Sequence, residues 1–186
     1  MRLLIEGCKY SGKSTLVQKL SNIHRNATKV EYRAFTQQGK TNNFAIHSDV
    51  EQRLIALSNF VVSTHDDDIF LLRGHLSVFA LAETLNQSLG FSFYEIDKMF
   101  WEADILLVLL TINQDAYEER FCVRSKEGRD VLGDYNSWKK ISEKQELYKY
   151  YFNLSSLSKI VIDTSSINLT KSIDLIEEDY HNRIIL

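Results

Sequence analysis

The chain has 186 residues, of which 44% are hydrophobic and 25% are charged, so a collagen-like, coiled-coil or largely disordered polypeptide is not expected. This length is enough to bury a core in one globular domain, residues 1–186. The formal net charge is −3, from 22 basic and 25 acidic residues, and a chain with this balance carries no strong nucleic-acid signal.

Cysteine content and hydropathy favour a reducing, cytoplasmic location. Only Cys8 and Cys122 occur, whereas an oxidised secreted scaffold needs more cysteines. The apolar stretch at the N-terminus is shorter than the core of a signal peptide. No apolar run approaches about 18 residues, so no membrane partner is expected.

Strands alternate with helical patterns along the whole chain, which is typical of an α/β domain with a parallel sheet. Residues 2–6 predict the first strand, and a Gly-rich turn then leads into a helix. A second strand is expected at 29–35, and a polar connection follows it. Ser48 and Glu51 then form a capping box that opens a helix ending near residue 65.

The second half of the chain continues this alternation. Further strands are expected at 69–72, 104–112 and 159–163, and the very apolar segment 104–112 should lie in mid-sheet. Helices are expected at 76–85, at 94–101, from about 115, at 139–152 and at 170–180. Five parallel strands joined by crossover helices predict one layered sheet.

The strongest chemical signal is the segment from Gly7 to Ser14, which reads Gly-Cys-Lys-Tyr-Ser-Gly-Lys-Ser. It is a complete G-x-x-x-x-G-K-[ST] motif with a strand before it and a helix after it, the context that a phosphate-binding loop requires. The glycines allow the backbone N–H groups to curl around a phosphate, and the helix N-terminus adds positive charge. Lys13 would bridge the β- and γ-phosphates, and the Ser14 hydroxyl would bind Mg²⁺. The expected nucleotide-binding residues of this loop are Gly7, Tyr10, Ser11, Gly12, Lys13, Ser14 and Thr15.

The remaining motifs do not support a regulatory GTPase. Asp130 to Gly133 matches D-x-x-G in letters, but it lies in a polar connection after a helix rather than after a strand. Asp115 lies two residues after Asn113, one residue too early for the N-K-x-D motif that recognises guanine.

Around Arg73 the sequence resembles the thymidylate kinase-like branch of nucleoside and nucleotide kinases. The segment IFLLRGHLSVFA is similar to the third strand and arginine-bearing loop of that family, with Arg73, Ser77 and Ala80 at matching offsets. Arg53 falls where the family places an arginine facing the substrate.

Two later blocks extend the resemblance over most of the chain. Residues 103–130 are similar to the family's next strand, helix and arginine-bearing lid, and residues 159–176 to its C-terminal strand, adenine-side loop and helix. The resemblance implies a three-layer α/β/α P-loop nucleotide kinase fold with a five-stranded parallel sheet and a short lid at approximately residues 120–134. It also implies ATP and Mg²⁺ as cofactors, a small-molecule nucleotide or nucleoside as substrate, and a homodimer.

Residue roles follow from the same resemblance. Arg124 and Arg129 would clamp the phosphates and Arg73 would hold the acceptor's phosphate, because phosphoryl transfer is catalysed mainly by positioning and cationic stabilisation. Arg120 would stack on adenine, and the loop that begins at Thr164 would line the base. Since Arg120 and Arg124 are four residues apart on one helix face, a solvated helix surface is the alternative interpretation.

The sequence departs from the family pattern on the substrate side. The family has an acidic residue directly before the arginine of its third-strand motif, where this chain has Leu72. It ends its second strand with a Glu-Pro pair, where this chain reads Arg33-Ala34-Phe35. At these positions no carboxylate is therefore present to bind Mg²⁺ or to act as a base, as the acid of the family would.

Three carboxylates are candidates to replace that acid: Glu31, Asp49 and Glu51. A carboxylate facing the acceptor can hold a hydroxyl or a metal-bound water. Asp49 and Glu51 equally suit the first turn of a helix, where the macrodipole favours acidic residues.

A nucleobase pocket needs flat apolar faces and planar donors, which Phe35, Arg53 and Phe79 could supply. Core packing is the alternative for both phenylalanines. His75 lies near the expected site and is either a substrate contact or an ordinary loop residue. The residues expected to bind substrate are Arg33, Phe35, Arg53 and Ser77.

Together these patterns predict an ATP- and Mg²⁺-dependent kinase that phosphorylates a (deoxy)nucleoside monophosphate, with Lys13, Arg73, Arg124 and Arg129 as its catalytic cations. A deoxynucleoside kinase, which phosphorylates a 5′-hydroxyl, is the near alternative. A non-catalytic ATP-binding module is the third, because the acid before Arg73 is missing.

Overall fold

Five short segments of the chain form one parallel sheet. The structure is a computed structural model that describes residues 1–32, 35–38, 43–46, 49–64, 68–128 and 137–184. The strands of the sheet are β1 (Arg2–Gly7), β2 (Thr28–Glu31), β5 (Ile69–Leu72), β6 (Leu106–Thr111) and β7 (Ser158–Asp163). They lie in the order β2-β5-β1-β6-β7, and each neighbouring pair is parallel. The sheet expected from the sequence is therefore confirmed.

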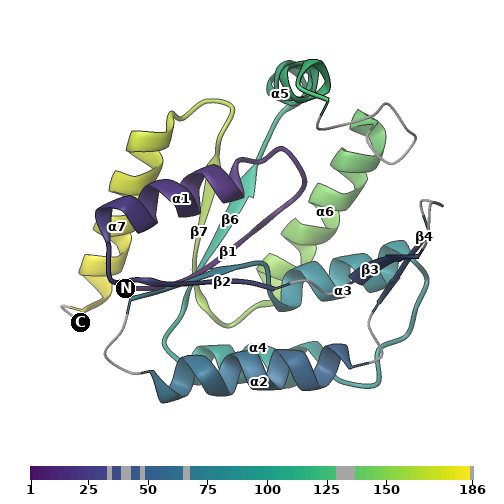
Figure 1. Ribbon diagram of the computed structural model, residues 1–186. Coiled ribbons are helices and arrows are strands. Elements are labelled where there is room, and N and C mark those ends of the chain that lie inside the picture. Colours follow the sequence, from purple (N-terminus) through teal and green to yellow (C-terminus); the bar gives the residue numbers. More distant parts are fainter. Residues whose placement is uncertain (33–34, 39–42, 47–48, 65–67, 129–136, 185–186) are drawn as a thin grey trace.

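Helices cover both faces of this sheet and complete the expected three layers (Figure 1). One face packs against α1 (Lys13–Ile23) and α7 (Leu169–Ile184). The other packs against α2 (Val50–Ser63), α3 (His75–Thr84), α4 (Phe93–Glu102) and α6 (Trp138–Leu154). A further helix, α5 (Gln114–Lys126), follows β6 and stands beyond the end of the sheet.

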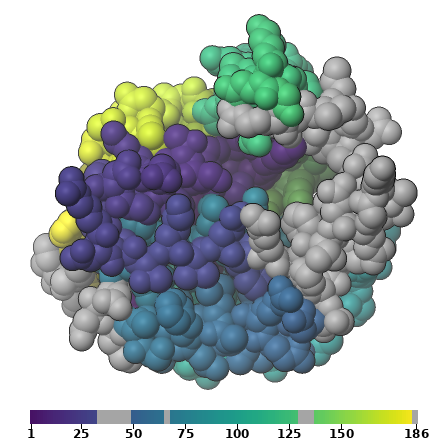
Figure 2. All heavy atoms as spheres, in the orientation of Figure 1, coloured from purple at the N-terminus to yellow at the C-terminus, as the bar shows by residue number. Residues whose placement is uncertain are grey.

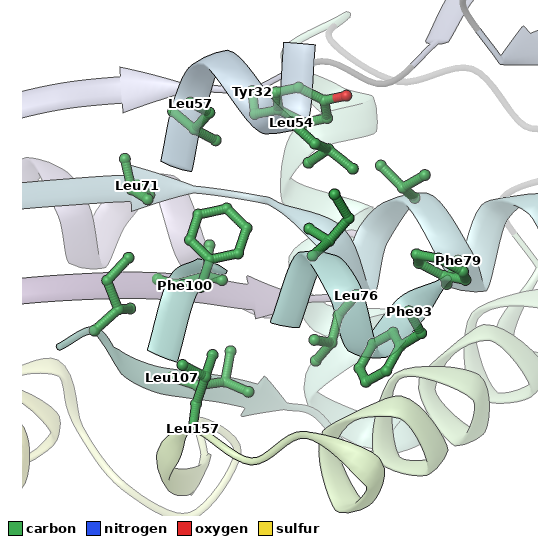
Figure 3. Packing of buried hydrophobic residues seen from close by; sticks show 14 of the residues in the cluster. Tyr32, Leu54, Leu57, Leu71, Leu76, Phe79, Phe93, Phe100, Leu107 and Leu157 are labelled. Atoms are coloured by element: carbon green, nitrogen blue, oxygen red, sulfur yellow. The ribbon is translucent and has the colours of Figure 1, made fainter. Parts of the chain in front are cut away.

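The buried side chains alternate along the strands, as the twofold period of a β-strand requires. Leu3 and Ile5 pack toward α1 and α7, whereas Leu4 between them packs toward the other helices. Figure 3 shows the second of these layers, in which apolar side chains of the sheet and of the helices interlock; the labelled ones include Leu54, Leu57, Leu71, Leu76, Phe79, Phe93, Phe100 and Leu107. Phe79 belongs to this core, which favours the packing interpretation over the nucleobase contact.

The strand expected at 29–35 is shorter than the sequence suggested. β2 ends at Glu31, whose partner in the ladder is Leu72, the last residue of β5. The Tyr32 N–H still donates to the Leu72 carbonyl oxygen at 2.9 Å, and the described ladder ends with that bond. Two segments of the following stretch form a separate antiparallel hairpin, β3 (Phe35–Gln38) and β4 (Asn43–Ile46), where the sequence predicted a strand end and a polar connection.

The start of α2 also differs from expectation. Asp49 is its N-cap residue, and the Asp49 carboxylate pairs with the Arg53 guanidinium at 2.8 Å instead of bonding the first turn. Glu51 occupies the first turn, as the macrodipole favours. The capping role expected of Ser48 lies outside the described residues.

Cys8 is buried and Cys122 is exposed, and both are free thiols. Within the described ranges, the helices lack the combination of length and apolar content needed to cross a membrane.

The strand order fixes where a ligand can bind. From β1 the chain proceeds to β2 and β5 on one side of the sheet, and later to β6 and β7 on the other. In open parallel sheets, ligands bind beyond the carboxyl ends of the strands at such a reversal of strand order. The Gly-rich loop follows β1 directly and therefore lies at that point.

Candidate functional site

Gly7 and Gly12 allow the loop after β1 to turn as it does. Both have a left-handed backbone, with φ of 138° and 90°, a region that strains residues with a Cβ. A Cβ on Gly7 would lie 2.3 Å from the Leu110 carbonyl oxygen of β6. The first glycine of the motif is therefore required by the close approach of two strands.

Ser11 and Lys13 brace the inside of this loop. The Ser11 hydroxyl donates to the Cys8 carbonyl oxygen at 2.9 Å, and the Lys13 ammonium donates to the same oxygen at 2.5 Å. Burial of the ammonium lowers the pKa of Lys13 to about 8. Ser11 is fully buried, so its side chain supports the loop rather than lining a surface.

The N-terminus of α1 is open to a ligand. Its N-cap is Gly12, and within the described part of the chain no side chain caps the helix and no acidic residue lies in its first turn. The first N–H groups of a helix need partners and attract anions. Ser14 and Thr15 of this first turn are exposed and line a cavity of about 990 Å³. This volume is at the upper end of the range for small-molecule sites.

Five elements besides the loop and the start of α1 line this large cavity: the residue after β5, the end of β6, the outer part of α5, the segment that follows β7, and the first turn of α7. Figure 2 shows α5 above the purple N-terminal residues and beside the yellow C-terminal ones. The lining includes Lys13, Arg73, Arg120, Arg124 and Thr164. Cations that are far apart in the sequence thus meet around one space.

Arg120 ties α5 to both sides of the cavity. Its Nη1 donates to the Tyr10 carbonyl oxygen at 2.8 Å and to the Thr164 hydroxyl at 3.0 Å, and its Nη2 donates to the Thr164 carbonyl oxygen at 2.6 Å. The Thr164 hydroxyl also lies 3.1 Å from the Ser11 carbonyl oxygen. The interpretation of Arg120 as part of a solvated helix face is therefore wrong, because its guanidinium is engaged with backbone on both sides.

Tyr10 connects the loop to the same helix through aromatic contacts. Its backbone is left-handed, with φ of 69°, and its ring meets those of Tyr117 and Phe121 edge-on, at centroid distances of 5.2 and 5.9 Å. The Arg124 guanidinium lies 5.4 Å from the centre of the Tyr10 ring, a distance at which a cation is attracted to an aromatic face. Arg124 is thereby held over the loop.

Arg73 adopts a strained backbone where β5 gives way to α3. Its φ is 68°, unusual for a residue with a long side chain, and such residues cluster at functional sites. Its N–H donates to the Ile5 carbonyl oxygen of β1 at 3.0 Å. Its Nη1 donates to Glu31 Oε1 at 2.7 Å, so Glu31 is the one of the three candidate carboxylates that reaches the large cavity's wall.

A second, smaller hollow of about 530 Å³ lies between β2 and α2. Glu31, Tyr32 and Arg53 line it, together with apolar residues of α2. Arg53 is thus placed on the Glu31 side of the Arg73 ion pair, and not in the large cavity. Its guanidinium is engaged by Asp49.

Ser77 does not line either cavity, contrary to expectation. It is buried in α3, where its hydroxyl bonds to the Glu6 carboxylate and lies 3.0 Å from the Tyr148 hydroxyl. Glu6 also accepts from the Gly74 and Ser77 N–H groups at 2.8 and 3.2 Å. Glu6 therefore caps the N-terminus of α3, and Ser77 is part of that cap.

Glu6 is a site-supporting residue that sequence reasoning missed. It is fully buried at the end of β1, and burial raises the pKa of its carboxyl above the usual value, while its hydrogen bonds with Ser77 oppose that shift. Its partners lie about 70 positions further along the chain, so nothing local marked it. The one signal was an acidic residue inside an otherwise apolar strand.

His75 is not a substrate contact. It is fully buried, and its Nε2 lies 2.8 Å from Asp97 Oδ1. The ring also packs against Phe93 and Phe100, so His75 belongs to the core under α3.

Three expected site residues fall outside this description. Arg33 and Arg129 are not among the described residues, and of Phe35 only the backbone is described, at the start of β3. The described part of the expected lid is the end of α5.

The residues present fit a nucleoside triphosphate with its magnesium ion. The open helix N-terminus, the Lys13 ammonium and the exposed Ser14 hydroxyl are the groups that phosphates and Mg²⁺ require. Magnesium keeps several waters and binds mainly through substrate phosphates, so it needs few protein ligands. Accordingly, the described residues contain no cluster of three or more His, Cys, Asp or Glu side chains suited to a metal.

Comparisons with known proteins identify the fold. The sequence matches no protein-family model and no curated protein. A solved structure of YorR protein from Bacillus subtilis, in complex with phosphorylated GDP, is similar with a TM-score of 0.71 and 19% identity over 97% of this chain and 98% of that chain. Thymidylate kinase from Candida albicans is similar with a TM-score of 0.62 and 19% identity over 97% and 91%. Deoxyadenosine kinase from M. mycoides, with dCMP and dCDP bound, has a TM-score of 0.56 and 14% identity over 98% and 100%.

These likenesses confirm the resemblance at the level of the fold. The chain has the three-layer α/β/α P-loop kinase fold that the sequence suggested.

Proposed function

We propose, from the premise of this P-loop kinase fold, that the protein transfers the γ-phosphoryl group of ATP to a small nucleotide, a (deoxy)nucleoside monophosphate. The observation that carries the proposal is the meeting of Lys13, Arg73 and Arg124 around one cavity with an uncapped helix N-terminus. Phosphoryl transfer needs cations placed around a phosphate and little other chemistry from the protein.

ATP would occupy the cavity between the loop and α5. The Lys13 ammonium and the N–H groups at the start of α1 would bind the β- and γ-phosphates, and Ser14 would hold Mg²⁺, which neutralises the phosphate oxygens. Arg120 would present its guanidinium to adenine, since its hydrogen bonds to Tyr10 and Thr164 fix its orientation. Arg124, over the Tyr10 ring, would reach the transferred group; Arg129 is proposed to join it.

The acceptor would lie on the Glu31 side of the large cavity. Arg73 is proposed to bind the acceptor's phosphate, with Glu31 holding its guanidinium in place. Arg33, Phe35 and Arg53 remain the proposed contacts for the rest of the acceptor. The structures that are similar in fold include a thymidylate kinase and a deoxyadenosine kinase with the products dCMP and dCDP bound, which supports a nucleotide or nucleoside as the acceptor.

Glu31 is also the observation that favours the second candidate function. It is the last residue of β2, and its carboxylate pairs with Arg73, which lines the large cavity. A carboxylate there could take the proton of an acceptor hydroxyl, which is the chemistry of a nucleoside kinase. This alternative differs from the first in the product that it makes.

Product analysis separates the candidates. The protein is incubated with ATP, Mg²⁺ and, separately, each common nucleoside and nucleoside monophosphate, and the products are resolved by chromatography. Diphosphate products support the proposal, monophosphate products from nucleosides support the alternative, and ATP binding without any product shows a binding module.

Two variants serve as controls. Lys13→Ala is expected to abolish transfer, and Lys126→Ala, on the exposed end of α5, to leave it intact.

The proposal also includes the cytoplasm as the protein's location, on the basis of its free cysteines, and a homodimer as its assembly.

A further inference from the structure

Four buried residues mark the face of α6 that packs into the molecule: Ile141, Gln145, Tyr148 and Phe152. They recur at intervals of three or four residues, as one face of a helix requires. Three of them carry aliphatic or aromatic side chains, whereas Gln145 carries an amide and is only 7% exposed. A buried amide needs hydrogen-bond partners, and those of Gln145 belong to two segments that border the large cavity.

The first partner of Gln145 is the backbone of Ile112, which lies just before α5. The amide oxygen accepts from the Ile112 N–H at 2.9 Å, and the amide nitrogen donates to the Ile112 carbonyl oxygen at 3.1 Å. The ladder between β6 and β7 ends one residue earlier, at Thr111 and Asp163, so Gln145 takes the place of a neighbouring strand at Ile112. The next residue, Asn113, is the N-cap of α5. This pair of hydrogen bonds therefore fixes the point at which α5 begins.

The second partner of Gln145 is Cys8, which follows the first glycine of the loop. The Cys8 thiol, a weak donor, lies 3.6 Å from the same amide oxygen. The Cys8 carbonyl oxygen accepts from the Lys13 ammonium and from the Ser11 hydroxyl. Cys8 thus contacts α6 with its side chain and the proposed phosphate-binding lysine with its backbone.

Apolar packing joins the same three elements. One buried cluster contains residues of the loop, of the segment from Ile112 into α5, and of α6: Cys8, Tyr10, Ile112, Tyr117 and Ile141. The Trp138 ring, at the start of α6, packs against it with its centre 5.5 Å from that of the Tyr117 ring. Figure 1 shows that α6 begins near α5. The loop and α5, which both line the large cavity, therefore rest on the first half of α6.

We propose that Gln145 is a positioning residue for the ATP site. Through its two contacts it holds the loop and α5 at the separation at which Lys13 and Arg124 both reach the phosphates. This inference rests on the proposed function, because it assigns a role toward that same site. Since Gln145 lies outside the lining of the large cavity, it acts through these neighbours. Preorganised placement of cations is what phosphoryl transfer requires from a protein.

The test compares Gln145→Met, which keeps the length of the side chain and removes its hydrogen bonds, with two controls on α6. Phe152 lies two turns further along the same face and belongs to the core shared with α3 and α4 rather than to the cluster with the loop. Phe152→Leu therefore controls for a general loss of stability. Glu146→Gln changes an exposed residue that pairs with Lys149 at 2.7 Å, and controls for substitution on α6 as such.

Three measurements are made on each protein. Calorimetry gives the affinity for a non-hydrolysable ATP analogue with Mg²⁺, at a temperature at which every variant is folded. Steady-state transfer gives kcat and the KM values of ATP and of the acceptor, and thermal unfolding gives the melting temperature.

Gln145→Met is expected to bind the ATP analogue at least about tenfold more weakly, because the Ile112 backbone and the loop lose their partner. We expect kcat to fall as well, whereas KM for the acceptor should stay within about twofold, since the Arg73 N–H is held by β1. The melting temperature should fall by roughly 4–8 °C. Phe152→Leu should also melt at a lower temperature and yet keep the wild-type affinity, kcat and KM values, and Glu146→Gln should match wild type throughout.

A second variant tests the loop contact alone. Cys8→Ala removes the thiol and leaves both hydrogen bonds to Ile112, so it preserves the fold even if Gln145→Met does not. It should weaken binding of the ATP analogue about threefold and leave the KM for the acceptor unchanged. Wild-type affinity in this variant contradicts a role of Gln145 through the loop.

An unchanged affinity of Gln145→Met for the ATP analogue overturns the inference. A loss of equal size in Phe152→Leu also overturns it, because reduced stability alone would then explain the weaker binding. If the wild-type protein phosphorylates an acceptor and Gln145→Met keeps the wild-type kcat and KM for ATP, only the inference fails. If the wild-type protein binds no ATP, the proposed function fails and takes the inference with it.

Discussion

The ion pair between Arg73 and Glu31 joins the two hollows of the molecule. Arg73 lines the large cavity beside the Gly-rich loop, Glu31 lines the smaller hollow between β2 and α2, and their charged groups meet at 2.7 Å. Glu31 is the last residue of β2, and Arg73 directly follows the neighbouring strand β5. The ladder between these strands ends at the pair Glu31 and Leu72. A ligand that binds the Arg73 guanidinium is therefore affected by whether the Glu31 carboxylate is charged and paired with it.

Replacing Glu31 tests which acceptor the site serves. Glu31→Gln keeps an oxygen that can accept from Arg73, so if Glu31 only positions Arg73 we expect KM for the monophosphate to rise about three- to tenfold, with kcat changed less. If Glu31 is instead a base for a nucleoside hydroxyl, kcat should fall by a factor of about 100 or more. Steady-state kinetics on both acceptor classes distinguish these outcomes.

ATP binding should be accompanied by proton uptake in mildly alkaline solution. The pKa of Lys13 is lowered by burial to about 8, so at pH 8.5 roughly three-quarters of this amine is neutral in the free protein. The negative phosphates raise that pKa, and the protein must take up a proton to bind them. Calorimetric titrations with ATP and Mg²⁺ in buffers of different ionisation enthalpy should reveal uptake at pH 8.5 and little at pH 7.0. Equal uptake at both values contradicts the placement of Lys13 at the phosphates.

Arg120 should matter for both stability and ATP affinity. Arg120→Ala removes three hydrogen bonds that join α5 to the loop and to Thr164, and we expect a loss of about 1–2 kcal/mol in the free energy of unfolding and at least about tenfold weaker ATP binding. The measurements are urea unfolding and equilibrium nucleotide titration. Lys126→Ala, on the same helix, should match wild type in both; an Arg120 variant that behaves like Lys126→Ala contradicts the clamp.

Glu6 should support the fold in a pH-dependent manner. Glu6→Ala leaves two backbone N–H groups and a hydroxyl at α3 without their acceptor, so we expect a loss of about 2–3 kcal/mol. In the wild-type protein, burial raises the pKa of Glu6 above its unfolded value of 4.5, so the folded state holds this proton more tightly. That stabilisation is fully present below pH 4.5 and is lost as the pH rises through the folded pKa.

The matched variant for this pH effect is Glu6→Gln, which cannot titrate. The difference in unfolding free energy between wild type and Glu6→Gln should shift against wild type between pH 4.5 and 8. A difference that is constant across this range shows that the carboxyl is not perturbed as described.

The loop of the proposed nucleotide site was predictable from the sequence because its motif is local. Gly7, Lys13 and Ser14 lie within one segment of eight residues. The loop that they form depends on the residue types and their spacing in this segment, and not on distant contacts. The strand at 69–72 was also predicted with its observed bounds, because four successive buried residues mark a strand of a parallel sheet.

The acceptor side depended on contacts that the sequence does not display. Residues 29–35 were interpreted as one strand, yet β2 stops at Glu31, opposite the last residue of β5, and Phe35 belongs to the separate hairpin. Ser77 matched a family offset, but Glu6, 71 positions earlier, uses its hydroxyl.

The most direct test of the central claim is the fate of the γ-phosphoryl group itself. ³¹P NMR of a mixture of the protein, ATP, Mg²⁺ and a panel of deoxynucleoside monophosphates follows every phosphorus atom at once. The account predicts one new nucleoside diphosphate for each ADP formed and no release of inorganic phosphate. When Lys13→Ala replaces the wild-type protein, ATP and the monophosphates should stay unreacted. Inorganic phosphate formed without a phosphorylated acceptor, or ATP that remains intact with every acceptor, would contradict it.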